Sequence, residues 1–236
     1  MITGASSDFG MRIIERNFAD YEKIIAHYNK NGDRLRSISE RYSGKLILKQ
    51  ADLCDNNAVR RMMQELSDEY MLPDHFIHLA AKRIEYKRFR QCTASDFDEE
   101  LRCSVLSFVE IMSVVLPDMA KKKYGKIAVM LSSCLVSKPP KFMSTYVVSK
   151  YALLGTVLAL AEEYSDRGIC INAVSPIMTD TGFISQVPQM IIDMNREKNV
   201  MKRNLCVDDV IPTIEYLLST ASDRVTGQNL FISGVK

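Results

Sequence analysis

The chain alternates short apolar runs with longer segments in which apolar residues recur every three or four positions. Short apolar runs are typical of buried strands, and the wider spacing is typical of helices with one buried face. Strands are predicted just before Gly4 and at 21–27, 46–52, 75–81, 126–133, 170–174 and 230–232. Helices are predicted after the Gly4 turn and at 56–70, 96–120, 146–166 and 207–219. This alternation predicts an α/β fold, a doubly wound parallel sheet with helices on both faces.

Nothing in the chain marks a second domain. Its 236 residues fall within the range of one α/β domain, and the sequence has neither internal repeats nor low-complexity linkers. Residues 175–204 interrupt the alternation and are expected to be irregular with short helical pieces. We therefore expect a single domain over 1–236.

Composition and charge exclude several function classes. A net charge of +2, with both signs mixed along the chain, predicts no strong field for nucleic acid or a membrane surface. No run reaches 18 uninterrupted apolar residues, and Met1 leads into Ile-Thr-Gly rather than a signal peptide. We expect a cytoplasmic protein without membrane contact.

Metal-binding spacing is also missing. Six cysteines are scattered singly, which predicts reduced and mostly buried thiols, and the three histidines have no partner ligands at useful spacing. We expect no metal site. The cysteines are Cys54, Cys92, Cys103, Cys134, Cys170 and Cys206, and the histidines are His27, His75 and His78.

Candidate catalytic residues are concentrated between Ser133 and Lys150. Tyr146 and Lys150 are four residues apart at the start of an apolar helix, so both side chains face the same way. A lysine charge near the phenol favours the phenolate and would lower the tyrosine pKa from about 10 towards neutral pH. The alternative is a core tyrosine beside a lysine that extends to solvent.

Two further segments suit a dinucleotide. The glycine turn from Thr3 to Gly10 ends a strand and begins a helix, where free N–H groups can bind phosphate. The second strand is followed by Asn29 and Lys30, with Arg34 close by, rather than by the acid that accepts from the ribose 2′-OH of NAD. NADP(H) is therefore favoured over NAD(H); the alternative is a solvated polar loop.

Together these features resemble the short-chain dehydrogenase/reductase family over essentially the whole chain, in the pattern of bacterial 3-oxoacyl-(acyl carrier protein) reductases. The resemblance implies a single-domain, Rossmann-like reductase. It depends on five motifs: Thr3–Gly10 as T-G-x-x-x-G-x-G, Asp52-Leu53, the spacing of Ser133, Tyr146 and Lys150, Asn172-Ala173-Val174-Ser175-Pro176 followed by Thr179 and Thr181, and Thr226-Gly227-Gln228.

The resemblance also implies the chemistry. An NADPH-dependent reduction of a 3-oxoacyl thioester or similar apolar ketone would use Ser133, Tyr146 and Lys150, with Ser104 in the place of the family's asparagine. That asparagine kinks its helix and holds a water of the proton relay behind the lysine. The expected cofactor-binding residues are Gly4, Ser6, Ser7, Phe9, Gly10, Asn29, Lys30, Asp52, Leu53, Ala80, Tyr146, Lys150, Thr179 and Thr181.

Four departures from the family pattern keep two alternatives open. Asp8 replaces the middle glycine, Ser104 replaces the asparagine, and Ile177 replaces the glycine after Pro176. These changes would suit a catalytically silent cofactor-binding subunit. The segment 78–81 reads His-Leu-Ala-Ala instead of N-N-A-G, a form typical of the branch acting on nucleotide sugars. It favours a sugar or other small-metabolite ketone as the substrate.

The family's substrate lid corresponds to 181–204, which is rich in Met and Ile and suits an acyl chain. Alternatively, these residues only pack the lid onto the body. Basic residues at 121–123, 126 and 167 lie where carrier-dependent relatives bind an acidic acyl carrier protein; a helix end that favours cations explains the lysines equally well. The helices at 96–120 and 146–166 resemble the family's interfaces, so we expect a homodimer or homotetramer.

Overall fold

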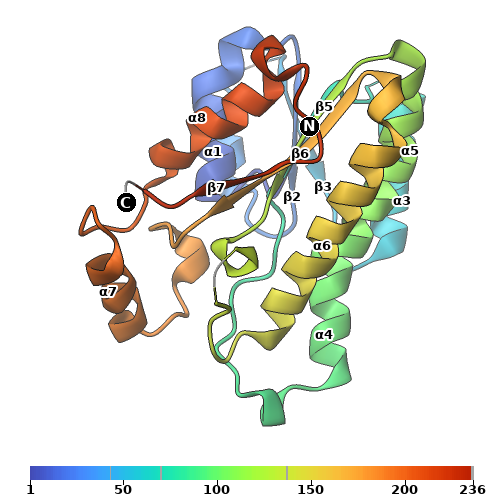
Figure 1. Ribbon diagram of the computed structural model, residues 1–236. Coiled ribbons are helices and arrows are strands. Elements are labelled where there is room, and N and C mark those ends of the chain that lie inside the picture. The colour runs from blue at the N-terminus through green and yellow to red at the C-terminus, as the bar shows by residue number, and fades with distance from the viewer. Residues whose placement is uncertain (43, 70, 137, 235–236) are drawn as a thin grey trace.

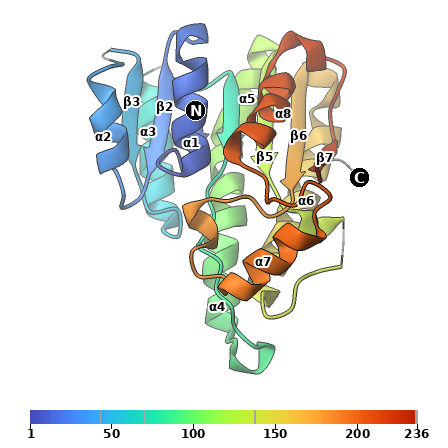
Figure 2. The same cartoon turned by 90° about the vertical axis from the view of Figure 1, so that its left-hand side faces the viewer.

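Seven parallel strands form one sheet in the computed structural model, in the order β3-β2-β1-β4-β5-β6-β7 (Figure 2). The structure describes residues 1–42, 44–69, 71–136 and 138–234. The α/β prediction of a doubly wound parallel sheet is confirmed. The strands are β1 (Ile2–Thr3), β2 (Ile24–Tyr28), β3 (Leu46–Gln50), β4 (His75–His78), β5 (Gly125–Met130), β6 (Ile169–Pro176) and β7 (Asn229–Ile232).

Helices cover both faces of this sheet (Figure 1). One face carries α1 (Asp8–Asn17), α2 (Asp33–Ser39) and α8 (Val207–Leu218), which share a core of aliphatic side chains such as Ile14, Leu35 and Ile211. The other carries α3 (Asn56–Asp68), α5 (Ser107–Lys122) and α6 (Ser144–Glu163), packed around a second core. Each core excludes water from one side of the strands, so the sheet is buried on both faces.

The long helix predicted at 96–120 is interrupted. It consists of α4 (Ala94–Leu101), a π-helical turn over Arg102–Leu106, and α5. Thr93 caps α4, its hydroxyl accepting from the Asp96 N–H at 3.3 Å. The π-helical turn contains Ser104, so the helix is distorted where the family's asparagine would stand.

The predicted elements differ from the structure in several places. The second strand begins at Ile24 instead of residue 21, because Phe18–Asp20 forms a 3₁₀ turn. Helix α2 is not predicted by the sequence pattern, since only Leu35 and Ile38 form its buried face. The segment 175–204, expected to be irregular with short helical pieces, contains α7 (Gln189–Lys198). Residue 70, the last residue of the helix predicted at 56–70, lies outside the described residues.

The carboxyl ends of the strands meet at one edge of the sheet, where α7 and the lower end of α4 lie (Figure 2). Among the described residues, the stretches Ala94–Lys122 and Ser144–Glu163 are long and apolar enough to cross a membrane. This is a weak indication, because core helices have the same length and composition, and half of the most apolar window of the first is buried. The cavity described next opens at this edge.

Candidate active site

A cavity of about 790 Å³ lies at the carboxyl edge of the sheet. Segments from the whole chain meet there, as expected at the switch point of a doubly wound sheet. Every predicted site residue except Gly10 and Ser104 lines it; their functional roles stay predictions. These lining residues are Gly4, Ser6, Ser7, Phe9, Asn29, Lys30, Asp52, Leu53, Ala80, Ser133, Tyr146, Lys150, Thr179 and Thr181.

The glycine turn has the shape of a phosphate cradle. Gly4 has a φ of 66°, and a Cβ there would lie 3.2 Å from the Ala80 backbone, so glycine lets the chain pass closely. Gly10 lies behind the turn, where a Cβ would be 2.4 Å from the Ala5 carbonyl oxygen. Helix α1 therefore begins at the cavity wall, with Ser7 as its cap. This arrangement fits the pyrophosphate of a dinucleotide.

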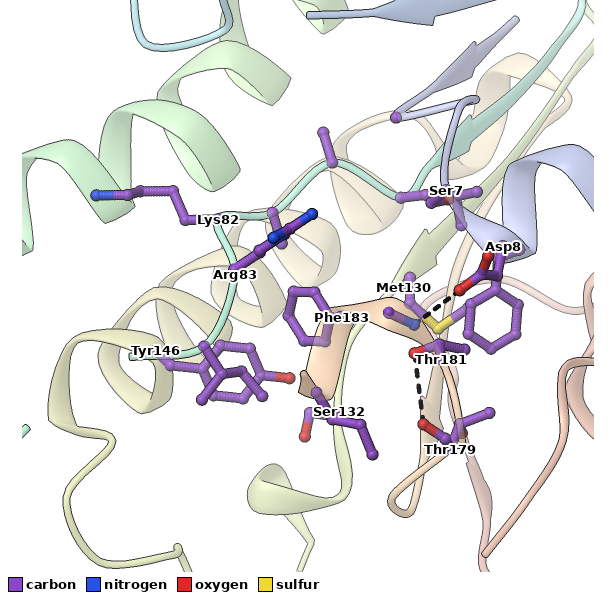
Figure 3. A pocket seen from close by; sticks show the side chains of 18 of the residues that line it. Ser7, Asp8, Lys82, Arg83, Met130, Ser132, Tyr146, Thr179, Thr181 and Phe183 are labelled. Carbon is purple, nitrogen blue, oxygen red and sulfur yellow. Dashed lines mark hydrogen bonds between the residues drawn. The ribbon is translucent and has the colours of Figure 1, made fainter. Parts of the chain in front are cut away.

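Asp8 connects this turn to the lid. One carboxylate oxygen accepts from the Arg34 guanidinium at 2.8 Å, and the other accepts from the Gly182 N–H at 2.8 Å (Figure 3). Burial acts to raise the Asp8 pKa, but the Gly182 and Arg34 hydrogen bonds hold it below its usual value. The replacement of the family's glycine thus places an ion pair beside the start of α1.

The two predicted discriminating residues, Asn29 and Lys30, line the cavity at the end of β2. The Asn29 carbonyl accepts from the Gln50 side chain at 2.9 Å, which holds the loop against β3. Arg34 lines the same region but is paired with Asp8. Asp52 binds its own loop, accepting from the Cys54 N–H at 2.9 Å.

Tyr146 and Lys150 lie deep in the cavity, 7% and 3% exposed. The lysine Nζ lies 5.7 Å from the centre of the tyrosine ring and donates to the Met130 carbonyl at 2.9 Å. Burial raises the pKa of Tyr146, while a hydrogen bond with Ser132 opposes the rise. The sequence argument expected Lys150 to lower this pKa; in the structure burial raises it, and the opposing contribution comes from Ser132.

A second serine, next to the one that the spacing selects, binds the tyrosine. Ser132 lies at the hydroxyl end of Tyr146 and forms the hydrogen bond named above (Figure 3). Its hydroxyl also accepts from the Cys134 N–H at 3.3 Å, which fixes the turn after β5. Ser133 lines the same cavity one residue further on. The Ser-Ser pair at a strand end was the sequence signal for both hydroxyls.

Ser104 lies outside the cavity, fully buried in the π-helical turn. Its carbonyl accepts from His78 Nε2 at 3.0 Å, and Thr3 Oγ1 lies 2.9 Å from Nδ1 of the same ring. Its hydroxyl donates to the carboxylate of Glu100 at 3.4 Å. Sequence analysis missed Glu100, because it reads as one of several charged residues at the start of a helix.

The lid places apolar side chains above Tyr146. The Phe183 ring lies 6.1 Å from the tyrosine ring, centre to centre (Figure 3). Ile184 and Val187 are buried against Tyr146. Thr179 and Thr181 bind their own loop, each hydroxyl donating to a carbonyl two residues earlier, at 3.0 and 3.4 Å. The large apolar side chains of the segment 181–204 that are exposed are Met190, Met194 and Val200.

The basic residues predicted to bind an acyl carrier do not lie at the cavity. Lys126 is 2% exposed and pairs with Asp223 at 2.6 Å, so it cannot contact a partner. Lys122 pairs with Asp74 and Asp118 at the amino-terminal end of β5, the opposite edge of the sheet. Exposed basic side chains do occur in the segment 82–90, the first part of which lines the cavity. They include Arg83, Arg88 and Arg90, of which Arg83 lines the cavity.

Comparisons with known proteins agree with this geometry. The family model described as enoyl-(acyl carrier protein) reductase matches residues 17–234. The 3-oxoacyl-[acyl-carrier-protein] reductase FabG of Staphylococcus epidermidis is 22% identical over 99% of this chain and 96% of its own length. Acetoacetyl-CoA reductase of Cupriavidus necator is 23% identical over 99% of this chain and 95% of its own.

A solved short-chain dehydrogenase from Burkholderia cenocepacia, in complex with NADP, has a TM-score of 0.86. It is 24% identical, with 99% of this chain and 95% of the other covered. The family match spans nearly all of the chain, and the fold agrees with it. The chain therefore belongs to the short-chain dehydrogenase/reductase family and is an NAD(P)-dependent oxidoreductase acting on CH–OH or C=O groups.

Proposed function

We propose that this protein reduces an apolar ketone, such as a 3-oxoacyl thioester, to a secondary alcohol with NADPH. The observation that carries the proposal is one continuous cavity, which joins the glycine cradle to Tyr146 and Lys150 beneath an apolar lid. The names of the Staphylococcus and Cupriavidus relatives, reductases of 3-oxoacyl and acetoacetyl thioesters, support the substrate class.

Each residue of the cluster has a defined task in this proposal. A nicotinamide cofactor held in this cavity would supply the hydride that the carbonyl carbon receives. Tyr146 donates its proton to the carbonyl oxygen, a contribution of typically 10² to 10⁴ in rate. Ser133 and Ser132 donate hydrogen bonds where negative charge develops. Lys150 binds the ribose hydroxyls, and Thr181 orients the carboxamide.

The preference for NADPH depends on the end of β2. Lys30 is exposed and Asn29 half-buried at the cavity wall, so both can reach a 2′-phosphate. Arg34 could also contact the 2′-phosphate once its ion pair with Asp8 is broken. The similar Burkholderia dehydrogenase, solved as a complex with NADP, points the same way. Binding of NADH with equal affinity would contradict this part.

The substrate end of the cavity combines apolar walls with a basic mouth. Ile84 and Met143 complete the apolar cluster around Tyr146, which suits an acyl chain. The basic segment 82–90 suits the phosphates of a carrier arm or the acidic surface of an acyl carrier protein. The remaining alternatives are a small-metabolite ketone, or a silent subunit in which Asp8 blocks the cofactor.

The assembly is proposed to be a single-domain homodimer or homotetramer in the cytoplasm. Apolar side chains remain exposed along α5 and α6, and such patches mark protein interfaces. These exposed side chains lie on the π-helical turn and on both helices, so a second copy of the chain could bury them. These residues are Leu106, Val109, Val148, Tyr151 and Leu158.

The test is Tyr146→Phe, measured with NADPH and a panel of 3-oxoacyl thioesters and simple ketones. We expect turnover to disappear and NADPH affinity to stay nearly unchanged, because only the proton donor is lost. Tyr216→Phe, an exposed tyrosine on α8, is the control and should behave as wild type. Equal turnover in Tyr146→Phe would refute the proposed chemistry.

A further inference from the structure

A carboxylate is buried directly behind the proposed catalytic pair. Glu100 lies near the end of α4, is only 5% exposed and does not line the cavity. Removing a carboxylate from water is unfavourable unless hydrogen bonds or an opposite charge compensate. A buried acid here therefore needs partners, and the structure provides two kinds.

The first partners are hydroxyl groups from two elements. Oxygen Oε1 of Glu100 lies 3.4 Å from Oγ of Ser104 in the π-helical turn and 3.4 Å from Oγ of Ser149 on α6. Ser149 also donates to the Tyr146 carbonyl at 2.9 Å, so its single proton is shared. Glu100 thus contacts the helix residue that immediately precedes Lys150.

The second partner is charge. Burial lowers the pKa of Lys150 to about 8, and Glu100 is the largest influence that raises it. Burial likewise raises the pKa of Glu100, and Lys150 is the largest influence that lowers it. Both groups are removed from water, so each stabilises the charged form of the other. The other groups that face this pair are Lys82, Cys103, Cys134, Tyr146 and His78.

We propose that Glu100 is a positioning residue that acts through Lys150. Its carboxylate, held by Ser104 and Ser149, keeps the lysine protonated and thereby sets the alkaline limit of the site. Glu100 lies one helical turn before Ser104, so a charge stands behind the lysine where the resemblance leads one to expect an asparagine and its water. The consequence for catalysis rests on the ketone reduction proposed above.

The test is Glu100→Gln, which keeps the size of the side chain and removes the charge. The titration of Lys150 is followed by NMR of ¹³C-labelled lysine, assigned by the resonance that Lys150→Arg removes. We expect its midpoint to fall by about one pH unit, the lower end of the one to three units by which a nearby opposite charge typically shifts a pKa. The alkaline limb of kcat/KM should move down by the same amount, with little change near pH 6.

The control is Asp98→Asn, which removes the same charge from the same helix. Asp98 is 57% exposed and pairs with Arg102 at 2.7 Å on the surface, so its titration and pH profile should match wild type. Glu100→Asp, which keeps the charge, should retain most of the wild-type midpoint. This variant guards against a trivial effect of altered packing.

The outcomes separate the two proposals. If Glu100→Gln lowers the melting temperature but leaves the Lys150 midpoint and the alkaline limb unchanged, the glutamate is only structural and the inference is wrong. If wild-type protein reduces no ketone, the proposed function fails, yet the NMR titration still decides whether Glu100 controls Lys150. A lower midpoint in Glu100→Gln together with wild-type behaviour of Asp98→Asn supports the inference.

Discussion

Neutralising Asp8 should strengthen NADPH binding. The carboxylate lies at the start of α1, the helix end that would bind the pyrophosphate, and it also holds Arg34 at 2.8 Å. Asp8→Asn removes the charge but keeps an oxygen that can accept from the Gly182 N–H. The lid contact is therefore preserved, while Arg34 becomes available to the cofactor phosphates.

The expected gain in NADPH affinity depends on how exposed the charged side chains are. Two unit charges 4 Å apart interact with about 1 kcal/mol in water and about 4 kcal/mol near a protein surface. The Asp8 side chain is 33% exposed and that of Arg34 is 52% exposed, so solvent screening favours the lower part of this range. A gain of about 1.4 kcal/mol corresponds to tenfold tighter binding.

Fluorescence titration with NADPH measures this directly. The difference between Asp8→Asn and wild type should shrink at high salt, because partly exposed charges are screened. Asp33→Asn is the matched control: its carboxylate is 95% exposed, pairs with Arg36 instead of Arg34, and should not change the affinity. Equal or weaker binding in Asp8→Asn at low salt would refute the idea that this carboxylate opposes the phosphates.

Two further predictions concern the serine pair and acid stability. Because Ser132 binds the Tyr146 hydroxyl, Ser132→Ala should lower kcat by roughly 10²-fold although the family spacing selects Ser133; unchanged kcat in Ser132→Ala would contradict this. Burial lowers the pKa of His27 to about 4 and of His78 to about 3, below the value near 6.5 expected in the unfolded chain. The unfolded state therefore binds more protons below pH 6.5, and stability should fall by about 2 kcal/mol per histidine by pH 5. Thermal unfolding across this range should show the loss and His27→Gln should reduce it, whereas a melting temperature that is the same at pH 7 and pH 5 would argue against it.

The sequence was informative where the signal is local. The apolar runs located the strands to within a few residues, and glycine at positions 4 and 10 identified the turn, because backbone conformation there depends on the residue itself. Helix α2 escaped detection, since two apolar residues in seven give almost no periodic signal.

The sequence predicted many residues of the site but not the electrostatic environment of those residues. The spacing of Tyr146 and Lys150 placed both side chains in one cavity, because residues four apart share a helix face. It could not show that burial would dominate the tyrosine pKa. Nor could it show that Ser132 binds the Tyr146 hydroxyl, because the rotation of a turn depends on what packs against it.

Sequence alone thus determined the order of the strands, the parallel sheet and many of the residues at its carboxyl edge. Tertiary structure alone decided which charges meet. Asp8 and Gly182 are far apart in the chain, Lys126 is buried against Asp223, and Glu100 reaches Ser149 on another helix. The physical reason is that periodicity encodes the backbone locally, whereas the burial and pairing of a charge depend on how distant segments pack.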